Sequence, residues 1–195
     1  MSYPHQALNP VEKKIYRLAE RYLLTVRQDD LHVANALDFA FRLLETASGD
    51  RDVVIPALIL HDTGWSEIPE DMMARAFGPA ADVSLTRAHE QAGARIAAEV
   101  LMQVGYNGEK AAEILQIIDG HDTRQVPVSL NDKIIKDSDK LTRYAKCFPV
   151  FARVLGLTLP EYASILKSYG EHWFHLPVSR EMARTALRDY WQFEW

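Results

Sequence analysis

The sequence predicts an all-α fold: one domain, residues 1–195, that forms a helical bundle of about eight helices. Apolar residues recur at the spacing of a helix face along almost the whole chain, and alternating strand patterns are scarce. Capping residues and helix breakers divide this pattern into segments of helical length. A chain of 195 residues is long enough for one well-buried core and rather short for two. It contains no internal repeat, low-complexity tract or evident linker.

The individual helices are delimited by capping residues, prolines and glycines. In chain order, the expected starts are Asn9 with Pro10, Asp29 or Asp30, Asp50 or Asp52, a brief helix near Met72, then Ser84, Glu109, Ser129, Pro160 and Ser179. The expected breaks are Gly64, Gly78-Pro79, Gly105, Gly120 and Pro127. The third helix reads as a continuous apolar run that leads into His61 and Asp62.

Composition and charge narrow the function classes. Hydrophobic residues make up 48% of the chain and charged residues 25%, which is typical of a globular protein. The net charge of −5 provides no basic excess for general nucleic-acid binding. Cys147 is the single cysteine and lies among apolar neighbours, so we expect a buried thiol in a reducing compartment. The sequence shows no signal peptide and no transmembrane run, so the expected location is cytoplasmic, with no membrane partner.

Histidine and aspartate recur through the apolar segments, and this series is the main indication of function. Its members are His32, His61, Asp62, His89, His121 and Asp139. An imidazole buried without a partner carries a polar cost, so histidines among leucines and alanines need a physical reason. Several of them, combined with carboxylates, favour ligands that converge on a metal inside a helical bundle.

Each of these residues also has a simpler explanation when it is taken alone. His61 can interact with the dipole at a helix C-terminus while Asp62 begins a turn. His89 can be a half-exposed residue on an amphipathic helix, His32 a residue of a first helical turn, and His121 a residue of a C-cap. The series as a whole favours the metal site over these separate roles.

Asp139 and Gly93 also bear on the choice between a metal site and separate structural roles. Asp139 can form an ordinary ion pair with Arg143, four residues later on the same helix face. Gly93 lies on the helix face of His89, where the lack of a side chain lets another backbone or a metal cluster approach closely.

The order of these residues resembles the HD-domain superfamily of metal-dependent phosphohydrolases. The segments that carry the resemblance are DDLHVANAL, ALILHDTGW, RAHEQAGARI, IIDGHDT and IIKDSDKLTRY, and together they cover roughly residues 25–150. The resemblance implies an HD-domain-like bundle, completed by the C-terminal helices, whose metal ligands are His32, His61, Asp62 and Asp139. Asp139 is preferred to Asp137 because the family aspartate typically precedes a basic residue and a leucine.

The same resemblance implies one or two metal ions. Branches of the superfamily with two metals add two histidines, and His89 and His121 occupy those positions. The glycine-tyrosine-proline signature of the HD-GYP branch is absent, so hydrolysis of cyclic dinucleotides in particular is not supported. Nitrogen and oxygen ligands without thiolate suit Mn, Fe, Co, Ni or Zn, and several imidazoles suit Mg less well. A bound cation lowers the pKa of water and polarises a phosphoryl oxygen, and Asp62 is the expected catalytic residue, which positions the water.

Phosphate binding also requires cationic side chains, and three lie near Asp139. Lys136 and Arg143 share its helix face, and Lys140 follows it directly. We expect these three to bind the substrate. For Lys136 and Arg143, a helical ion pair with Asp132 or Asp139 is an equally good explanation.

The first hypothesis is therefore a metal-dependent phosphohydrolase, a phosphomonoesterase or phosphodiesterase. Its expected substrate is a small phosphate ester, with a nucleotide as one candidate. One alternative is a diiron oxygenase, because such a ligand set also holds a mixed-valence iron pair. Another is a non-catalytic metal- or nucleotide-binding module, against which the intact ligand set argues. The acidic chain predicts a small phosphorylated partner and no stable binding of duplex nucleic acid. The sequence makes no prediction of the oligomeric state.

Overall fold

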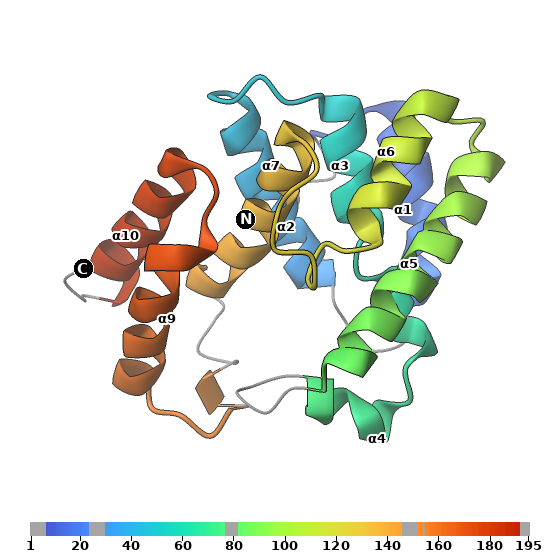
Figure 1. Cartoon of the computed structure of the whole chain (residues 1–195). Coiled ribbons are helices and arrows are strands. Elements are labelled where there is room, and N and C mark those ends of the chain that lie inside the picture. The colour runs from blue at the N-terminus through green and yellow to red at the C-terminus, as the bar shows by residue number, and fades with distance from the viewer. Residues whose placement is uncertain (1–6, 24–29, 77–81, 146–151, 154, 192–195) are drawn as a thin grey trace.

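The computed structural model of the chain describes residues 7–23, 30–76, 82–145, 152–153 and 155–191 (Figure 1). Within these ranges the regular secondary structure is entirely helical, which confirms the predicted fold class. The α-helices are α1 (Pro10–Leu23), α2 (Asp30–Leu44), α3 (Arg51–Leu60), α4 (Glu70–Met73), α5 (Val83–Gln103), α6 (Gly108–Ile118), α7 (Leu130–Leu141), α9 (Leu159–Trp173) and α10 (Pro177–Trp191). Short 3-10 helices are η2 (Thr63–Glu67), η3 (Ala74–Ala76) and η4 (Thr142–Tyr144).

Helix α3 is the centre of the bundle. Every residue from Val53 to Leu60 is buried, and the helix packs against α1, α2, α6 and α7. Because neighbours cover it on several sides, its sequence is a continuous apolar run rather than an amphipathic stripe. The helix ends at Leu60, before the expected Gly64, so His61 and Asp62 follow directly from the end of the most buried helix.

Several helix starts are confirmed at the level of single hydrogen bonds. Asn9 caps α1, because its Oδ1 accepts from the backbone amide of Glu12 at 2.9 Å. Ser129 caps α7 and accepts from the amide of Asp132 at 3.1 Å. Asp50, one of two candidates, caps α3. Each side chain satisfies an amide that the first helical turn leaves without a partner.

Two predicted caps are wrong. Asp82, rather than Ser84, caps α5 and accepts from the amide of Ser84 at 3.1 Å. Helix α10 begins two residues before Ser179. The amides of residues 175 and 176, just before this helix, donate to the carboxylate of Asp137 on α7 at 3.0 and 2.9 Å. This tertiary contact holds the segment that leads into α10.

Some expectations lie outside the described residues, namely the Asp29 cap, the Gly78-Pro79 break and the burial of Cys147. One cluster of buried apolar side chains extends from Leu8 to Leu187 and so includes residues of α9 and α10. In Figure 1 these two helices lie side by side on the left, next to α7, while α5 and α6 lie on the right. None of the described helices is long and apolar enough to cross a membrane.

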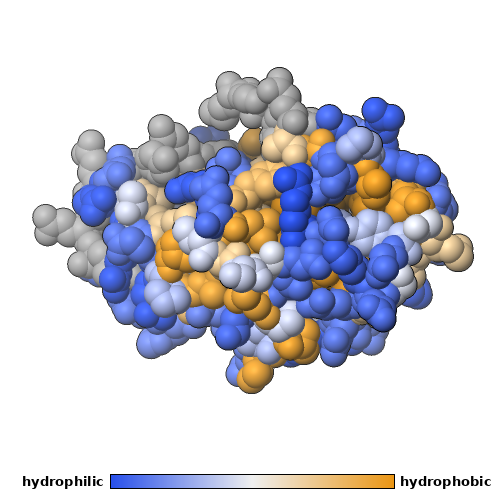
Figure 2. All heavy atoms as spheres, turned by 90° about the horizontal axis from the view of Figure 1, so that it is seen from above, coloured by the Kyte–Doolittle hydropathy of each residue, from blue (hydrophilic) through white to orange (hydrophobic). Residues whose placement is uncertain are grey.

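The surface is mixed in character. Seen from above, hydrophobic residues form several patches that hydrophilic residues separate (Figure 2). This distribution is ordinary for a globular protein, whose surface always includes much apolar area.

Two glycines, Gly64 and Gly93, allow the turn after α3 to lie close against α5. A Cβ atom on Gly64 would lie only 1.9 Å from the carbonyl oxygen of His89 and 2.4 Å from the amide nitrogen of Gly93. A Cβ atom on Gly93 would lie 3.1 Å from the carbonyl oxygen of His61. The close approach expected at Gly93 is therefore confirmed as a backbone contact. It holds the turn after α3 at a short distance from the helix that carries His89.

Candidate metal centre

The predicted ligand residues converge from five parts of the bundle. His32 comes from α2, His61 and Asp62 from the end of α3, His89 from α5, His121 from the loop after α6, and Asp139 from the last turn of α7. Their side chains are almost completely buried. The most open is His32, which is 14% exposed, whereas His89 is 0% exposed. The half-exposed alternative for His89 is therefore wrong.

One set of donor atoms, which we name the first donor group, consists of His32, His61, Asp62 and Asp139. The Nε2 atom of His32 lies 3.3 Å from Nε2 of His61, 3.4 Å from Oδ2 of Asp62 and 3.2 Å from Oδ1 of Asp139. The Nε2 atom of His61 lies 3.5 and 3.9 Å from the same two oxygens. Two ligands about 2.1 Å from one ion in tetrahedral geometry are about 3.4 Å apart, so these spacings suit a shared cation.

The second donor group consists of Asp62, His89, His121 and Asp122. The Nε2 atoms of His89 and His121 lie 3.4 Å apart. Each lies close to Oδ1 of Asp62, at 3.7 and 3.6 Å, and to Oδ2 of Asp122, at 3.6 and 3.7 Å. Asp62 thus belongs to both groups and turns a different oxygen toward each. A carboxylate in this position can bridge two cations.

Two of the four imidazoles are oriented by hydrogen bonds on the side away from the donor groups. Nδ1 of His61 lies 2.8 Å from the carbonyl oxygen of Leu58, and Nδ1 of His121 lies 2.9 Å from that of Ile118. With the proton on Nδ1, each ring donates to the backbone and turns the Nε2 lone pair inward. Histidine ligands of metals characteristically use their second ring nitrogen in this way.

Trp65 supports both His89 and the shared carboxylate. Its ring stacks on the imidazole of His89, with 3.9 Å between the centroids and 10° between the planes. Its Nε1 donates to Oδ1 of Asp62 at 3.1 Å. The side chain is only 3% exposed, so Trp65 packs within the centre.

Two buried charged residues hold the loop that carries His121 and Asp122. Glu90 accepts from the amides of Asp122 and Thr123, at 2.8 and 2.7 Å, and from the Thr123 hydroxyl. Lys136 donates to the carbonyl oxygens of Gly120, at 2.8 Å, and of His121. The Glu90 carboxylate accepts hydrogen bonds from loop amides, and the Lys136 ammonium donates to loop carbonyls. The loop is therefore anchored through both kinds of backbone group.

Asp137 and Asp139 have different surroundings. Oδ1 of Asp139 faces the first donor group, and its Oδ2 accepts from Arg143 at 3.2 Å. This carboxyl is buried, but Arg143 and the nearby imidazoles hold its pKa well below the usual value. Asp137 instead accepts from the backbone ahead of α10. Of the two candidates, only Asp139 lies at the centre.

The three predicted phosphate-binding cations differ in their exposure. The Lys136 ammonium is buried against the loop carbonyls described above. Lys140 is half-buried and lies 3.5 Å from the carbonyl oxygen of Trp173. Arg143 is 31% exposed, and besides its expected i+4 pair with Asp139 its guanidinium lies 5.4 Å from the Trp173 ring centroid. Arg143 is therefore the cation that combines contact with the centre and access to solvent.

The second donor group contains two histidines with opposite pKa shifts. Burial, with repulsion from His121, lowers the pKa of His89 to about 4. Burial acts in the same direction on His121, but the carboxylates of Asp122 and Asp62 outweigh it and raise its pKa to about 10. In the metal-free protein, a proton on His121 therefore lies where several carboxylate oxygens also attract a cation.

Sequence reasoning missed Asp122, Glu90 and Lys136 as parts of this arrangement. Asp122 had a local signal, because its segment repeats the His-Asp-Thr sequence of residues 61–63. Glu90 had a weaker one, as a carboxylate directly after a candidate ligand. The role of Lys136 depends on the path of the loop, which no local pattern encodes.

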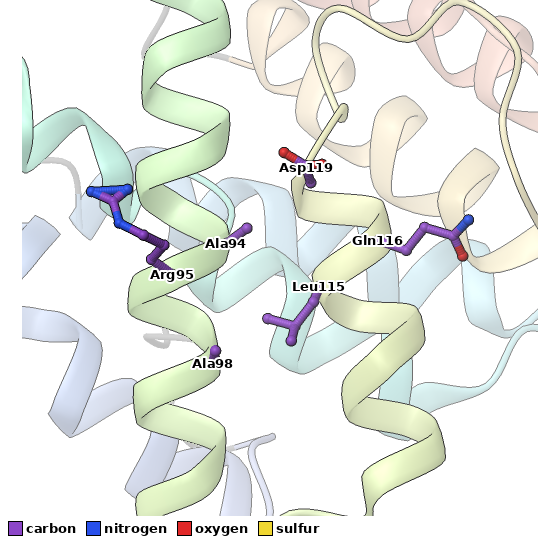
Figure 3. A pocket seen from close by; sticks show the side chains of 6 residues that line it. All are labelled: Ala94, Arg95, Ala98, Leu115, Gln116 and Asp119. Carbon is purple, nitrogen blue, oxygen red and sulfur yellow. The ribbon is translucent and has the colours of Figure 1, made fainter.

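A hollow of about 380 Å³ lies between α5 and α6, apart from these converging donors. Ala94, Ala98 and Leu115 form its apolar part, and Figure 3 shows Arg95 and Gln116 pointing away from the gap between the helices. Arg95 is paired with Glu67. The hollow thus presents no converging polar groups comparable with those of the two donor groups.

The comparisons with known proteins address the family. A family model described as HD domain matches residues 30–144, which is more than half of the chain. The matched segment includes every residue of both donor groups and ends before α9 and α10. Searches of curated proteins and of solved structures returned no match.

Proposed function

This chain belongs to the HD-domain superfamily of metal-dependent phosphohydrolases, and from this premise we propose that it hydrolyses a small phosphate ester with the help of two divalent cations. The observation that carries the proposal is Asp62, whose two oxygens face two separate donor groups. Paired cations of this kind occur in many enzymes of phosphate-ester hydrolysis, where they act on the attacking and leaving oxygens together.

The donor chemistry supports a metal rather than a network of hydrogen bonds. Four Nε2 atoms face one another and three carboxylates, with imidazole pairs only 3.3 and 3.4 Å apart. When neutral, His61 and His121, oriented through Nδ1, present Nε2 lone pairs there, and converging lone pairs require a cation or protons between them. The mixture of nitrogen and carboxylate oxygen suits Mn²⁺, Fe²⁺, Co²⁺, Ni²⁺ or Zn²⁺.

When bound, such cations lower the pKa of water and polarise a phosphoryl oxygen. The protein's own residues would divide the remaining work. Asp62 would orient the attacking water, because its carboxylate lies between the two donor groups. Arg143, next to Asp139 and partly exposed, would attract the phosphate and neutralise part of its charge.

We further propose that Lys136 acts on substrate only indirectly. Its ammonium is engaged with two backbone carbonyls of the loop that bears His121. A residue in that position holds a ligand loop in place. Arg143 and Lys140 remain the proposed substrate-binding cations.

The decisive experiment is phosphate release by metal-reconstituted protein. Chelator-treated protein would be supplied separately with Mn²⁺, Co²⁺ and Ni²⁺ and assayed on panels of small phosphomonoesters and phosphodiesters. We expect metal-dependent hydrolysis that falls at least about 100-fold in His61→Ala. Loss of a residue that only contacts a metal ligand typically lowers activity about 10–100-fold, and loss of a ligand itself should cost more. His172→Ala, which removes an exposed histidine of α9, is the matched control and should retain the activity.

The alternatives give different results in the same preparation. Oxygen consumption by the iron-loaded protein, without phosphate release from any ester, would indicate the diiron oxygenase. Metal binding without either reaction would indicate a non-catalytic module.

A further inference from the structure

The loop after α6 repeats the turn after α3. Each contains a His-Asp-Thr sequence, at residues 61–63 and 121–123. Each begins within three residues of the end of a helix that contributes its last residue to the buried core, Leu60 for α3 and Ile118 for α6. In each, Nδ1 of the histidine contacts the carbonyl oxygen three residues earlier and Nε2 faces the centre. The aspartate of the first turn is Asp62, the carboxylate shared by both donor groups. Asp122 occupies the equivalent position in the second turn.

The side of the imidazoles that Asp122 faces indicates its role. Carboxylates that merely orient a metal-binding histidine contact the nitrogen away from the metal. Oδ2 of Asp122 instead lies 3.6 and 3.7 Å from the Nε2 atoms of His89 and His121, the nitrogens that face the second donor group. The separation of these two Nε2 atoms from each other is 3.4 Å. The three atoms thus form a nearly equilateral triangle of suitable size for one cation.

The backbone of Asp122 is held in this position by buried charge. Its amide donates to Oε1 of Glu90, a side chain with 0% exposure. Arg87 pairs with the other oxygen of Glu90 at 2.8 Å, which compensates that buried carboxylate. On the far side of His121, Lys136 holds two carbonyls. The Asp122 side chain is 30% exposed, so these backbone contacts, rather than burial of the side chain, fix where its carboxylate can lie.

We propose that Asp122 is a metal ligand, the fourth donor of the second group, an inference that rests on the proposed metal centre. Both groups then have the same composition, with two imidazoles, one carboxylate of their own and the shared Asp62. The three carboxylates offset three of the four positive charges of two divalent cations. Such a balanced nitrogen and oxygen set favours two like ions, with Mn²⁺ as a suitable probe because carboxylates suit it well.

The test is a Mn²⁺ titration of metal-free protein, followed by the electron paramagnetic resonance signal of free Mn²⁺ and by elemental analysis. Wild type should bind two ions per chain. Asp122→Ala should bind the first ion with unchanged affinity and the second at least about 100-fold more weakly. Asp119→Ala is the matched control, because it removes a carboxylate from the same loop that faces Arg87 instead, and it should bind two ions as wild type does.

The outcomes separate this inference from the proposed function. Tight binding of both ions by Asp122→Ala would overturn the role of Asp122 and leave the metal centre intact. Wild type that binds a single ion, or none, would also overturn the role of Asp122. If wild type binds two ions and Asp122→Ala loses one, the inference stands even when no phosphate ester is hydrolysed. Unchanged affinity for the first ion shows that the variant is folded.

Discussion

Replacing Lys136 with methionine distinguishes a residue that holds the ligand loop from one that binds phosphate. The Lys136 side chain is 1% exposed, and its ammonium donates to the carbonyl oxygens of Gly120 and His121. Methionine keeps an unbranched apolar chain of similar length but has no donor. The substitution therefore leaves the buried His121 carbonyl without its donor, while the Gly120 carbonyl still accepts from the backbone amide of Arg124 at 3.1 Å.

The expected cost follows mainly from the His121 carbonyl. A buried polar group that loses its partner costs about 1–3 kcal/mol. Burial lowers the pKa of Lys136, which shows that the charged form is penalised by desolvation, and removal of that charge offsets part of the loss. We expect the free energy of unfolding to fall by about 1–3 kcal/mol. Because the loop carries His121, affinity for the second cation should fall about 10–100-fold.

Urea unfolding of the metal-free protein measures the stability term, and Mn²⁺ titration measures the affinity. Lys133→Met, on the same helix and half-buried, is the control and should change stability by less than about 0.5 kcal/mol. If Lys136→Met kept wild-type stability and metal affinity but raised KM for a phosphate ester, Lys136 would be a substrate ligand and the loop-holding role would be refuted.

Three further predictions concern packing, ligand identity and protons. Gly64→Ala should destabilise the protein by about 3 kcal/mol or more in urea unfolding, because the new Cβ meets backbone, whereas Gly108→Ala, with no atom within 4 Å, should not. Asp139→Ala should lose bound metal in elemental analysis, while Asp137→Ala should retain most of it and lose stability; the reverse pattern would move the ligand by two residues. The pKa of His121 is raised from 6.5 to about 10, so the metal-free protein should lose stability as pH rises between these values. Over the same range each pH unit should strengthen binding of the second cation by about tenfold, with release of about one proton in calorimetry across buffers of different ionisation enthalpy. A pH-independent affinity would contradict the assigned protonation of His121.

Much of the fold follows from local sequence, and the limits of that reasoning are physical. The buried run of α3 and the cap at Asn9 depend on neighbouring residues, and both were predictable. The segment before α10 is held by Asp137, nearly forty residues earlier in the chain, a contact that the local sequence around Ser179 does not reveal. Asp82 and Ser84 are both good caps, and only the backbone path distinguishes them.

In the candidate site, too, some features follow from local sequence and others depend on tertiary contacts. Histidines such as His61 and His89 are conspicuous because imidazoles are costly inside apolar segments. Asp122 attracted less notice, because an aspartate after a helix is common and its distance to His89 depends on how α5 and α6 pack. The helix face of Lys136, taken alone, predicts phosphate binding. That face also points to the loop after α6, which only the tertiary structure reveals.

The most direct test of the metal centre is a crystal structure of the Mn²⁺-loaded protein with anomalous diffraction data. Two anomalous peaks are expected, about 3.5–4 Å apart as in other two-metal sites. One should lie among His32, His61 and Asp139, the other between His89 and His121, and both should contact Asp62. A single peak, or two peaks that do not share Asp62, would contradict the two-cation centre.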